Sequence, residues 1–158
     1  METRLTARSF DSGVPHRAVR DSDGQDLAIL LYAAYRGTID DEKGTFDDAV
    51  AEIDGFFEGT YGRFFPDCSF VIEEGEFLVS ASLVTWWEPH DAPLLAFAMT
   101  RPEAQRRGLA RRLIEASMNA LLDRAYTRLT LLVTDGNTPA QNLYRSLGFR
   151  RFREPRRR

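Results

Sequence analysis

The sequence has one cysteine and two histidines, and each scarcity excludes a class of protein. Cys68 cannot form an internal disulfide, and with His16 and His90 it falls short of a metal-ligand set, so no metal site is predicted. There is no run of about 18 or more apolar residues to span a membrane. Charged residues within Met1–Phe10 leave no apolar stretch typical of a signal peptide. We therefore expect a cytoplasmic protein without a membrane partner.

Length and composition indicate one globular domain. The 158 residues suffice for one well-filled core and are few for two. We expect residues 1–158 to form a single domain with its core over about 17–152. The net charge of −3 hides an uneven distribution, because Arg36–Thr60 holds eight acidic residues against two basic ones. Arginines gather instead in 101–112 and 150–158, so ligands of opposite sign are expected at different places.

Hydrophobic periodicity and turn residues predict elements in the order β-α-α-β-β-β-α-β-α-β. The predicted strands are Arg17–Arg20, Ser69–Glu73, Phe77–Trp87, Leu94–Thr100, Leu129–Thr134 and Phe149–Arg153. The predicted helices follow Gly24, a Thr45 cap, Gly108 and a Thr138 cap. This order predicts an α/β fold, in which a mixed sheet carries helices on both faces.

The segment Gln105–Ala110 lies where the strand Leu94–Thr100 passes into an amphipathic helix. Main-chain N–H groups in the first turn of a helix have no partner within it, and the helix dipole adds positive charge, so this position suits a phosphate. Gly108 lets a ligand approach the main chain, and neighbouring arginines raise the positive potential. The chain has neither the G-x-x-x-x-G-K-[ST] of a P-loop nor the G-x-G-x-x-G of a dinucleotide fold. A different kind of phosphate ligand is therefore expected.

A second segment, Asn137–Phe149, follows about thirty residues later and decides the kind of ligand. Its residues fit the pattern N-x-x-A-x-x-L-Y-x-x-x-G-F, and Gln105–Ala110 fits [QR]-x-x-G-x-[GA], with all spacings in agreement. Together they resemble the cofactor region of the GNAT superfamily of N-acetyltransferases, and the element order over Arg17–Phe152 is similar more loosely. The resemblance implies a mostly antiparallel GNAT-like sheet. It also implies transfer of an acetyl group from acetyl-CoA, a co-substrate, to a primary amine by direct attack in a ternary complex.

The resemblance further implies which residues hold acetyl-CoA. Main-chain amides would bind its pyrophosphate at Gln105, Arg106, Arg107, Gly108, Leu109, Ala110 and Arg111. The main chain of Ala98, Met99 and Thr100 would pair with the pantetheine arm like a short strand, with Ala98 and Thr100 on the edge that faces it. Asn137 would contact the pantetheine side of the cofactor. Tyr144 would be the general acid that gives a proton to the leaving CoA thiolate.

A general base is harder to place, because Leu94–Thr100 contains no carboxylate. The attacking amine must lose a proton, often through water to a carboxylate or histidine. Glu88 is the first candidate, since it follows Trp86 and Trp87 directly, and burial beside an indole would raise its pKa. Further candidates in the nearby loops are His90, Asp91, Glu73 and Glu74. All of them also suit a solvated loop.

For the molecule that accepts the acetyl group, the sequence indicates only the sign of its charge. Gly37–Gly44 joins the first two predicted helices, and in proteins of this resemblance it forms one wall of the acceptor site. This wall is acidic here, so it would attract a cationic amine, either a small molecule or the basic end of a peptide. The same residues also suit a solvated helix face. A non-catalytic acyl-CoA-binding or regulatory domain is the alternative function.

The C-terminal end departs from the family pattern. Members commonly finish with a β-hairpin after the last helix, whereas this chain has one expected strand, Phe149–Arg153, and is therefore shortened. Either Leu5–Phe10 or a partner subunit of a homodimer would complete the edge of the sheet. The terminal arginines lack the interleaved aromatic residues of single-strand binders, so no nucleic-acid partner is expected. Binding of nucleic acid through this tail is the alternative from another class.

Overall fold

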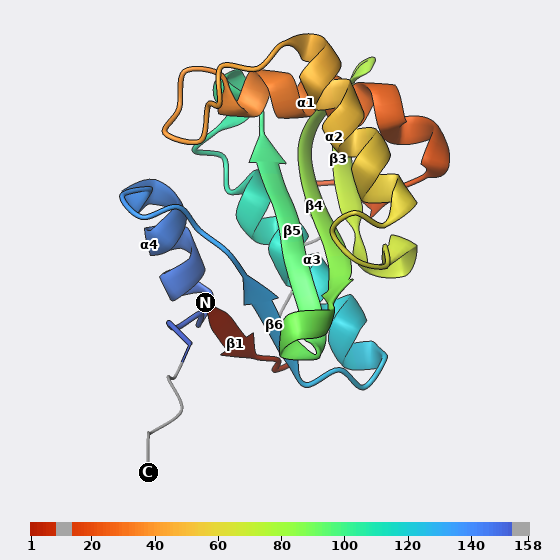
Figure 1. Ribbon diagram of the computed structural model, residues 1–158. Helices are drawn as coiled ribbons and strands as arrows, with labels where there is room; N and C mark the ends of the chain where they lie inside the picture. Colours follow the sequence, from red (N-terminus) through yellow and green to blue (C-terminus); the bar gives the residue numbers. More distant parts are fainter. Residues whose placement is uncertain (9–13, 153–158) are drawn as a thin grey trace.

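The computed structural model describes residues 1–8 and 14–152 and shows an open six-stranded sheet with helices on both faces (Figure 1). The strands are β1 (Glu2–Arg4), β2 (Arg17–Ala18), β3 (Phe70–Glu74), β4 (Phe77–Trp87), β5 (Ala92–Thr100) and β6 (Arg128–Leu131). The α-helices are α1 (Gly24–Tyr35), α2 (Phe46–Glu58), α3 (Leu109–Asp123) and α4 (Thr138–Ser146). Short 3-10 turns are η1 (Asp21–Asp23), η2 (Pro66–Cys68), η3 (Glu88–His90) and η4 (Pro102–Ala104).

The strand order is β1-β6-β5-β4-β3-β2. The β5–β6 pair is parallel, and the other neighbouring pairs are antiparallel. This mixed, mostly antiparallel sheet confirms the predicted fold class.

The sheet is packed between α1 and α2 on one face and α3 on the other (Figure 1). On the first face, Leu30, Ile53 and Phe56 are fully buried against Leu83 and Phe97 of the sheet. The cluster on the opposite face includes Ile114, Met118, Leu121, Val84, Leu129 and Leu131. Burial of each such side chain contributes about 1.5–3 kcal/mol to stability. The two clusters hold β5 between them from both faces of the sheet.

Side-chain caps decide where α2 and α4 begin. The Asp48 N–H donates to Thr45 Oγ1, and the Thr45 N–H donates to Asp48 Oδ2, which gives the expected start of α2. At α4 the Oδ1 atom of Asn137 accepts the N–H of Ala140 at 3.3 Å. The predicted Thr138 cap is therefore wrong by one residue, because asparagine is at least as good a cap as threonine.

The first residues of the chain fill the sheet edge beside β6. β1 pairs antiparallel with β6, and on its outer side Glu2 exchanges two main-chain hydrogen bonds of 2.8 Å with Arg150. The strand at this edge is therefore Glu2–Arg4 rather than Leu5–Phe10. Of that predicted segment, residues 9 and 10 lie outside the described part of the chain.

The predicted final strand Phe149–Arg153 is wrong. As far as Phe152 this segment forms one isolated bridge, from Arg150 to Glu2, and residue 153 lies outside the described residues. The physical reason is that β1 already pairs with β6 and, being three residues long, gives the C-terminal segment little strand to pair with. The side chain of Phe149 is fully buried instead, so packing holds this end of the chain.

The parallel strands β5 and β6 separate soon after they begin to pair. Their register is Leu94 with Thr130 and Leu95 with Leu131. β6 ends there, so the predicted strand Leu129–Thr134 is three residues too long, and Leu132 is 65% exposed. β5 continues to Thr100. One edge of β5 therefore faces a gap instead of a neighbouring strand (Figure 1).

Candidate active site

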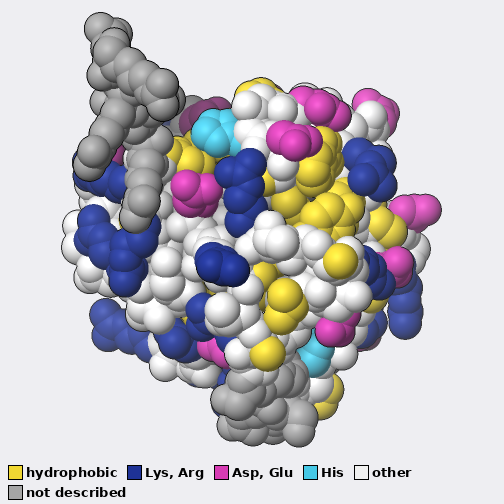
Figure 2. Space-filling model, turned by 90° about the horizontal axis from the view of Figure 1, so that it is seen from below, with side chains coloured by type: hydrophobic (Ala, Val, Ile, Leu, Met, Phe, Trp, Pro, Cys, Tyr) yellow, Lys and Arg dark blue, Asp and Glu magenta, His cyan; other side chains and the backbone are white. Residues whose placement is uncertain are grey.

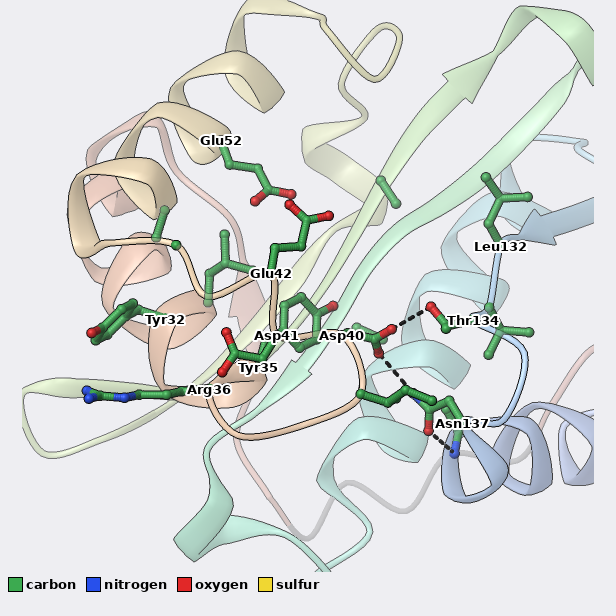
Figure 3. Close-up of a pocket in the computed structure, with 18 of the residues that line it drawn as sticks. Tyr32, Tyr35, Arg36, Asp40, Asp41, Glu42, Glu52, Leu132, Thr134 and Asn137 are labelled. Carbon is green, nitrogen blue, oxygen red and sulfur yellow. Dashed lines mark hydrogen bonds between the residues drawn. The ribbon is translucent and has the colours of Figure 1, made fainter.

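A cleft of about 450 Å³ opens where β5 and β6 separate. One of its walls comes from α1, the α1–α2 connection and α2, and the other from β5, residues 132–134 and the start of α4 (Figure 3). The cleft therefore brings the acidic connection predicted for the acceptor to the same place as Ala98, Asn137 and Tyr144, which were predicted for the cofactor.

The open edge of β5 offers main-chain groups to this gap. The Arg101 N–H donates to the Val79 carbonyl at 2.9 Å, and in an antiparallel pair such bonds recur at every second residue. Met99 therefore turns its main-chain groups toward β4, where its carbonyl also accepts the Ser80 hydroxyl at 3.0 Å. The N–H groups of Ala98 and Thr100 point the other way, into the gap. Ala98 and Thr100 thus have the predicted orientation, whereas Met99 is not brought to this edge.

A β-bulge in β5 marks the middle of the cleft. Leu83 pairs with Phe97 and the next residue of β4, Val84, pairs with Leu95, so Ala96 is an extra residue without a partner on β4. Ala96 is half-buried and lines the cleft. A bulge interrupts the ladder and re-aims the groups beside it, and bulges are over-represented next to active sites. The bulge therefore breaks the regular pairing of β4 and β5 at a point that lines the cleft.

The predicted phosphate loop lies beyond the C-terminal end of β5, at the start of α3. Gly108 has a φ of +73° at the N-terminus of α3, where no side chain caps the helix. The first-turn N–H groups are therefore directed outward, as an anion site requires. Arg106 has a φ of +63°, which costs a residue with a Cβ about 1–2 kcal/mol, and such strain gathers at functional sites. Leu109 is 2% exposed, so only its main chain can contribute.

Several polar side chains around this loop are already held by contacts within the protein. Arg101 is tied to the fold, because its Nε donates to the Leu78 carbonyl at 3.0 Å and its guanidinium lies over the ring of Phe77. Arg107 forms an ion pair with Glu74 of the β3–β4 hairpin. Three predicted contacts remain. The Nε2 of Gln105 lies 3.5 Å from the Thr100 carbonyl, and Ala110 is half-buried. Arg111 donates to Ser146 Oγ at 2.6 Å and forms an ion pair with Glu115 at 3.1 Å.

Tyr144 lies on α4 and lines the cleft. Burial, and secondly the charge of Asp40, raise the pKa of Tyr144 to about 12. The phenol is therefore protonated at neutral pH and is a proton donor. Its ring packs edge to face on Phe149, with ring centroids 5.9 Å apart. The buried Phe149 thus fixes the phenol in place.

A second tyrosine, Tyr35 at the end of α1, faces the same cleft (Figure 3). Burial is the main cause that raises its pKa, and Tyr144, Asp40 and Glu52 add to the effect, which places these groups close to one another. Tyr35 was not among the predicted site residues. Its hydroxyl, at the end of a helix whose buried side chains are apolar, is the signal in the sequence that could have found it.

The two walls are joined by Asp40 in the α1–α2 connection. Its Oδ1 accepts the hydroxyl of Thr134, and its Oδ2 accepts the side-chain N–H of Asn137 at 2.9 Å (Figure 3). Asn137 therefore caps α4 with its oxygen and binds Asp40 with its nitrogen. Its contact with pantetheine stays a prediction and would lie beside this interaction. We call the three residues the Asp40 tie.

Five carboxylates line the acidic wall, and most of them support the local fold. Asp41 accepts the N–H groups of Gly37 at 2.7 Å and Lys43 at 2.8 Å, and these bonds lower its pKa. Asp48 belongs to the cap of α2, and Asp40 to the tie described above. The lining carboxylates are Asp40, Asp41, Glu42, Asp48 and Glu52. Among the described hydrogen bonds, only the carboxylates of Glu42 and Glu52 therefore have no part in shaping the connection, capping α2 or forming the tie.

The predicted base Glu88 is not part of the cleft. It is exposed in η3, at the end of β4 and the opposite end of β5 from the phosphate loop (Figure 1). Figure 2 shows the face seen from below, where basic, acidic and hydrophobic side chains are interspersed. The other candidates lie outside the cleft as well: His90 stacks on Trp87 at 4.1 Å, Asp91 follows η3, Glu73 pairs with Arg17, and Glu74 pairs with Arg107. The structure therefore brings none of them to Tyr144.

The geometry described above leaves one edge of β5 open along a cleft. The model of the acetyltransferase (GNAT) family matches residues 27–149, and the chain belongs to this family. No sequence among the curated proteins matches it.

Solved structures agree in fold. PH1933 from Pyrococcus horikoshii OT3 superposes with a TM-score of 0.73 at 17% identity, covering 89% of this chain and 91% of that one. The ribosomal-protein-S18-alanine N-acetyltransferase from Escherichia coli gives 0.64 at 20% identity, covering 85% and 76%. The aminoglycoside N-acetyltransferase AAC(6')-Iy, solved in complex with CoA, gives 0.64 at 15% identity, covering 96% and 99%. At these identities the likeness is one of fold.

Two kinds of feature are absent from the part of the chain that the structure describes. Within 1–8 and 14–152, no helix combines the length and apolar character needed to cross a membrane. In the same residues, no three or more His, Cys, Asp or Glu side chains gather in a way that could hold a metal ion.

Proposed function

We propose that the protein transfers the acetyl group of acetyl-CoA to the primary amine of a cationic small molecule or peptide end. The observation that carries this proposal is the cleft, where the open edge of β5 and the phenol of Tyr144 face a wall of carboxylates. The two sides complement a thioester donor and a cationic acceptor. This arrangement supports direct attack in a ternary complex.

The β5 side fits an acyl-CoA. The unpaired N–H groups of Ala98 and Thr100 can bind the amide carbonyls of a pantetheine arm as a neighbouring strand would. A pyrophosphate fits the uncapped first turn of α3, where Gly108 adopts a left-handed conformation. In such a complex acetyl-CoA supplies an activated thioester. In bound acetyl-CoA, the pyrophosphate would lie at the loop and the reacting thioester carbonyl at the bulge, so the length of β5 between them separates the two groups.

The transfer forms one bond and breaks one. The nitrogen of the acceptor bonds to the acetyl carbon, and the carbon–sulfur bond breaks. A main-chain N–H at the Ala96 bulge stabilises the charge that develops on the thioester oxygen. The Tyr144 hydroxyl donates its proton to the departing sulfur, and its raised pKa keeps that proton in place at neutral pH until then.

The acceptor is a cation because the opposite wall is acidic. Carboxylates raise the local concentration of positively charged molecules and orient them toward the sheet. Their effect falls as ionic strength rises, so KM for the acceptor should increase with salt.

The test is a screen of amines with acetyl-CoA, in which release of free thiol is measured. We expect turnover with di- and polycationic amines or basic peptides, and weaker turnover with anionic amines of similar size. If the protein binds acetyl-CoA but releases no thiol above the uncatalysed rate with any amine, it is a non-catalytic acyl-CoA-binding domain, and the proposed reaction is wrong.

A further inference from the structure

Two carboxylates of the acidic wall, Glu42 and Glu52, have no part in capping a helix or shaping a loop. Glu52 projects from α2 and Glu42 from the α1–α2 connection, and their carboxylates point toward one another in the cleft (Figure 3). No ion pair with a basic side chain is described for either residue in 1–8 and 14–152. Two facing negative groups repel each other, so a positively charged group between them would be bound favourably.

Glu52 is the better anchored of the two. It is half-buried, whereas Glu42 is exposed, and its Oε1 accepts the hydroxyl of Tyr61 at 3.1 Å. The ring of Tyr61 packs edge to face on Phe97, with centroids 5.3 Å apart. Phe97 directly follows the bulge residue Ala96. A chain of contacts thus fixes the carboxylate of Glu52 relative to the part of β5 that faces the thioester.

We propose that Glu52 accepts the proton of the acceptor's ammonium group, so that the amine nitrogen can attack. This inference rests on the proposed function. One N–H bond of the ammonium breaks, its electron pair stays on nitrogen, and the proton goes to a carboxylate oxygen of Glu52. After attack the nitrogen still carries one proton more than the amide product needs, and it releases this proton to solvent as the carbon–sulfur bond breaks. The departing sulfur receives the proton of Tyr144, the phenol regains a proton from solvent, and Glu52 returns its proton to solvent, so one proton is released overall. The two proton transfers take place on opposite walls of one cleft.

Tyr61 is a positioning residue in this scheme. Burial and then the charge of Glu52 raise the pKa of Tyr61 to about 12, so the phenol stays protonated and keeps donating to the carboxylate. The bond occupies one oxygen of Glu52 and leaves the other for the acceptor. The titratable and charged groups that line the cleft together with Glu52 are Tyr32, Tyr35 and Arg36 from α1, Asp40, Asp41 and Glu42 from the connection, Asp48 from α2, and Tyr144 from α4. Tyr61, after α2, donates to Glu52.

The experiment compares Glu52→Gln with the unchanged protein, using the best amine from the screen and its β-fluorinated analogue. Fluorine lowers the pKa of the amine while changing its shape little, so the analogue arrives partly unprotonated. We expect Glu52→Gln to lower kcat for the ordinary amine by about 100-fold or more, the scale of general-base catalysis. For the fluorinated amine the loss should be about 10-fold or less, since that acceptor depends less on a base. Affinity for acetyl-CoA should stay the same.

Two companion variants separate proton transfer from charge attraction. Glu42→Gln should raise KM for the cationic amine and leave kcat in place, because Glu42 only attracts the acceptor. Glu58→Gln is the matched control: Glu58 lies at the end of the same helix, is exposed, and is not part of the cleft, so both constants should be unchanged. Tyr61→Phe keeps the carboxylate and should lower kcat less than Glu52→Gln does.

The outcomes are distinguishable. If Glu52→Gln keeps its kcat and only raises KM, or loses equally with both amines, Glu52 is not the proton acceptor and the proposed transfer still stands. If the unchanged protein turns over no amine, both proposals fall together. Should Glu52→Gln not fold, as judged by circular dichroism, Tyr61→Phe decides: an unchanged kcat with the ordinary amine overturns the inference.

Discussion

The two walls of the cleft differ in what they offer a ligand. The wall from β5 to α4 presents main-chain N–H groups and one phenol, and none of its lining residues is charged. The wall from α1 to α2 presents five carboxylates. Main-chain groups bind by direction and spacing, whereas charges act over a distance and depend little on fine geometry. A single change of backbone should therefore disable binding by main-chain groups, and single substitutions of the carboxylates should weaken the attraction of a cationic acceptor by degrees.

Gly108→Glu should have the largest effect, because it adds a negative charge where a pyrophosphate would bind and forces a side chain into a left-handed conformation. A Cβ at this position meets nothing within 4 Å, so the loss comes from charge and backbone strain rather than from a clash inside the protein. We expect acetyl-CoA affinity, measured by isothermal titration calorimetry, to fall by about 100-fold or more, which corresponds to about 2.7 kcal/mol.

Gly75→Glu is the matched control for that variant. Gly75 has a φ of +62° in the β3–β4 turn, and a Cβ there also meets nothing within 4 Å. It carries the same backbone cost without a charge at the start of α3. Equal affinity losses in the two variants, or no loss in Gly108→Glu, would remove the phosphate site from this loop.

Tyr144→Phe should lower kcat by about 100-fold, within the usual range for a general acid, because the leaving sulfur then departs without a proton. Binding of acetyl-CoA should change little, since the ring and its contact with Phe149 remain. Tyr126→Phe serves as the control, because Tyr126 packs against Phe65 away from the cleft. A variant with full kcat would show that water or another group protonates the sulfur.

Asp40→Ala should have a moderate effect, because it removes the hydrogen bonds that join the walls. We expect a loss of about 1–2 kcal/mol in holding the α1–α2 connection, seen as about a fivefold rise in KM for the acceptor. Amide exchange should become faster in residues 37–44. The pKa of Tyr144 should fall somewhat without the nearby charge, but the phenol remains protonated at neutral pH, so kcat should hold. An unchanged exchange rate in 37–44 would contradict the role of the tie.

Asp23→Asn should leave activity unchanged and lower stability, since Asp23 is a buried carboxylate that supports the fold and does not line the cleft. It is 4% exposed and accepts two hydrogen bonds from Arg17, at 2.7 and 2.8 Å, and one from the Arg20 N–H at 2.8 Å. Burial alone would raise the pKa of Asp23, but these bonds outweigh it and lower the pKa below 3.8. We expect the variant to lose about 3 kcal/mol of unfolding free energy at pH 7 by urea denaturation.

The sign of the pH dependence follows from that lowered pKa. The unfolded chain binds a proton at Asp23 more readily, so the stabilisation is complete above the unfolded value of 3.8 and is lost as pH falls through the lower folded value. The difference between the two proteins should therefore shrink at acidic pH. Asp54→Asn, an exposed change on α2, should show no such difference, and a change in kcat for Asp23→Asn would place Asp23 closer to the chemistry than its position indicates.

The wall from β5 to α4 and the turn before α3 could largely be predicted from the sequence because their parts are local. The turn at Gly108 and, to within one residue, the start of α4 each depend on a few consecutive residues whose spacing is fixed by helix geometry. The end of β6 could not be predicted in the same way. Leu132 and Val133 are apolar strand formers, and whether they pair depends on where β5 lies, which is a tertiary matter.

The charge of the wall from α1 to α2 was predictable in sign but not in detail. The acidic connection Gly37–Gly44 was visible, yet the sequence does not say that Asp41 shapes a turn while Glu52 meets Tyr61 after the helix has ended. Glu88 was chosen for its neighbours in sequence, and the sheet carries it to the far end of β5. Likewise Glu2–Arg4 has no apolar alternation to mark it as a strand, and its pairing partner lies at residues 128–130.

The Asp40 tie has a consequence for any redesign of acceptor preference. One carboxylate fastens segments that are 94 and 97 residues apart along the chain, so exchanging the whole α1–α2 connection for another would also cut the anchorage of α4. A library that keeps Asp40, Thr134 and Asn137 and randomises Glu42 and its exposed neighbours changes the charge presented to a new amine. The Asp40 tie between the walls stays intact in such a library. Acceptor specificity in this protein is thus best altered by point substitutions that leave the three residues of the Asp40 tie unchanged.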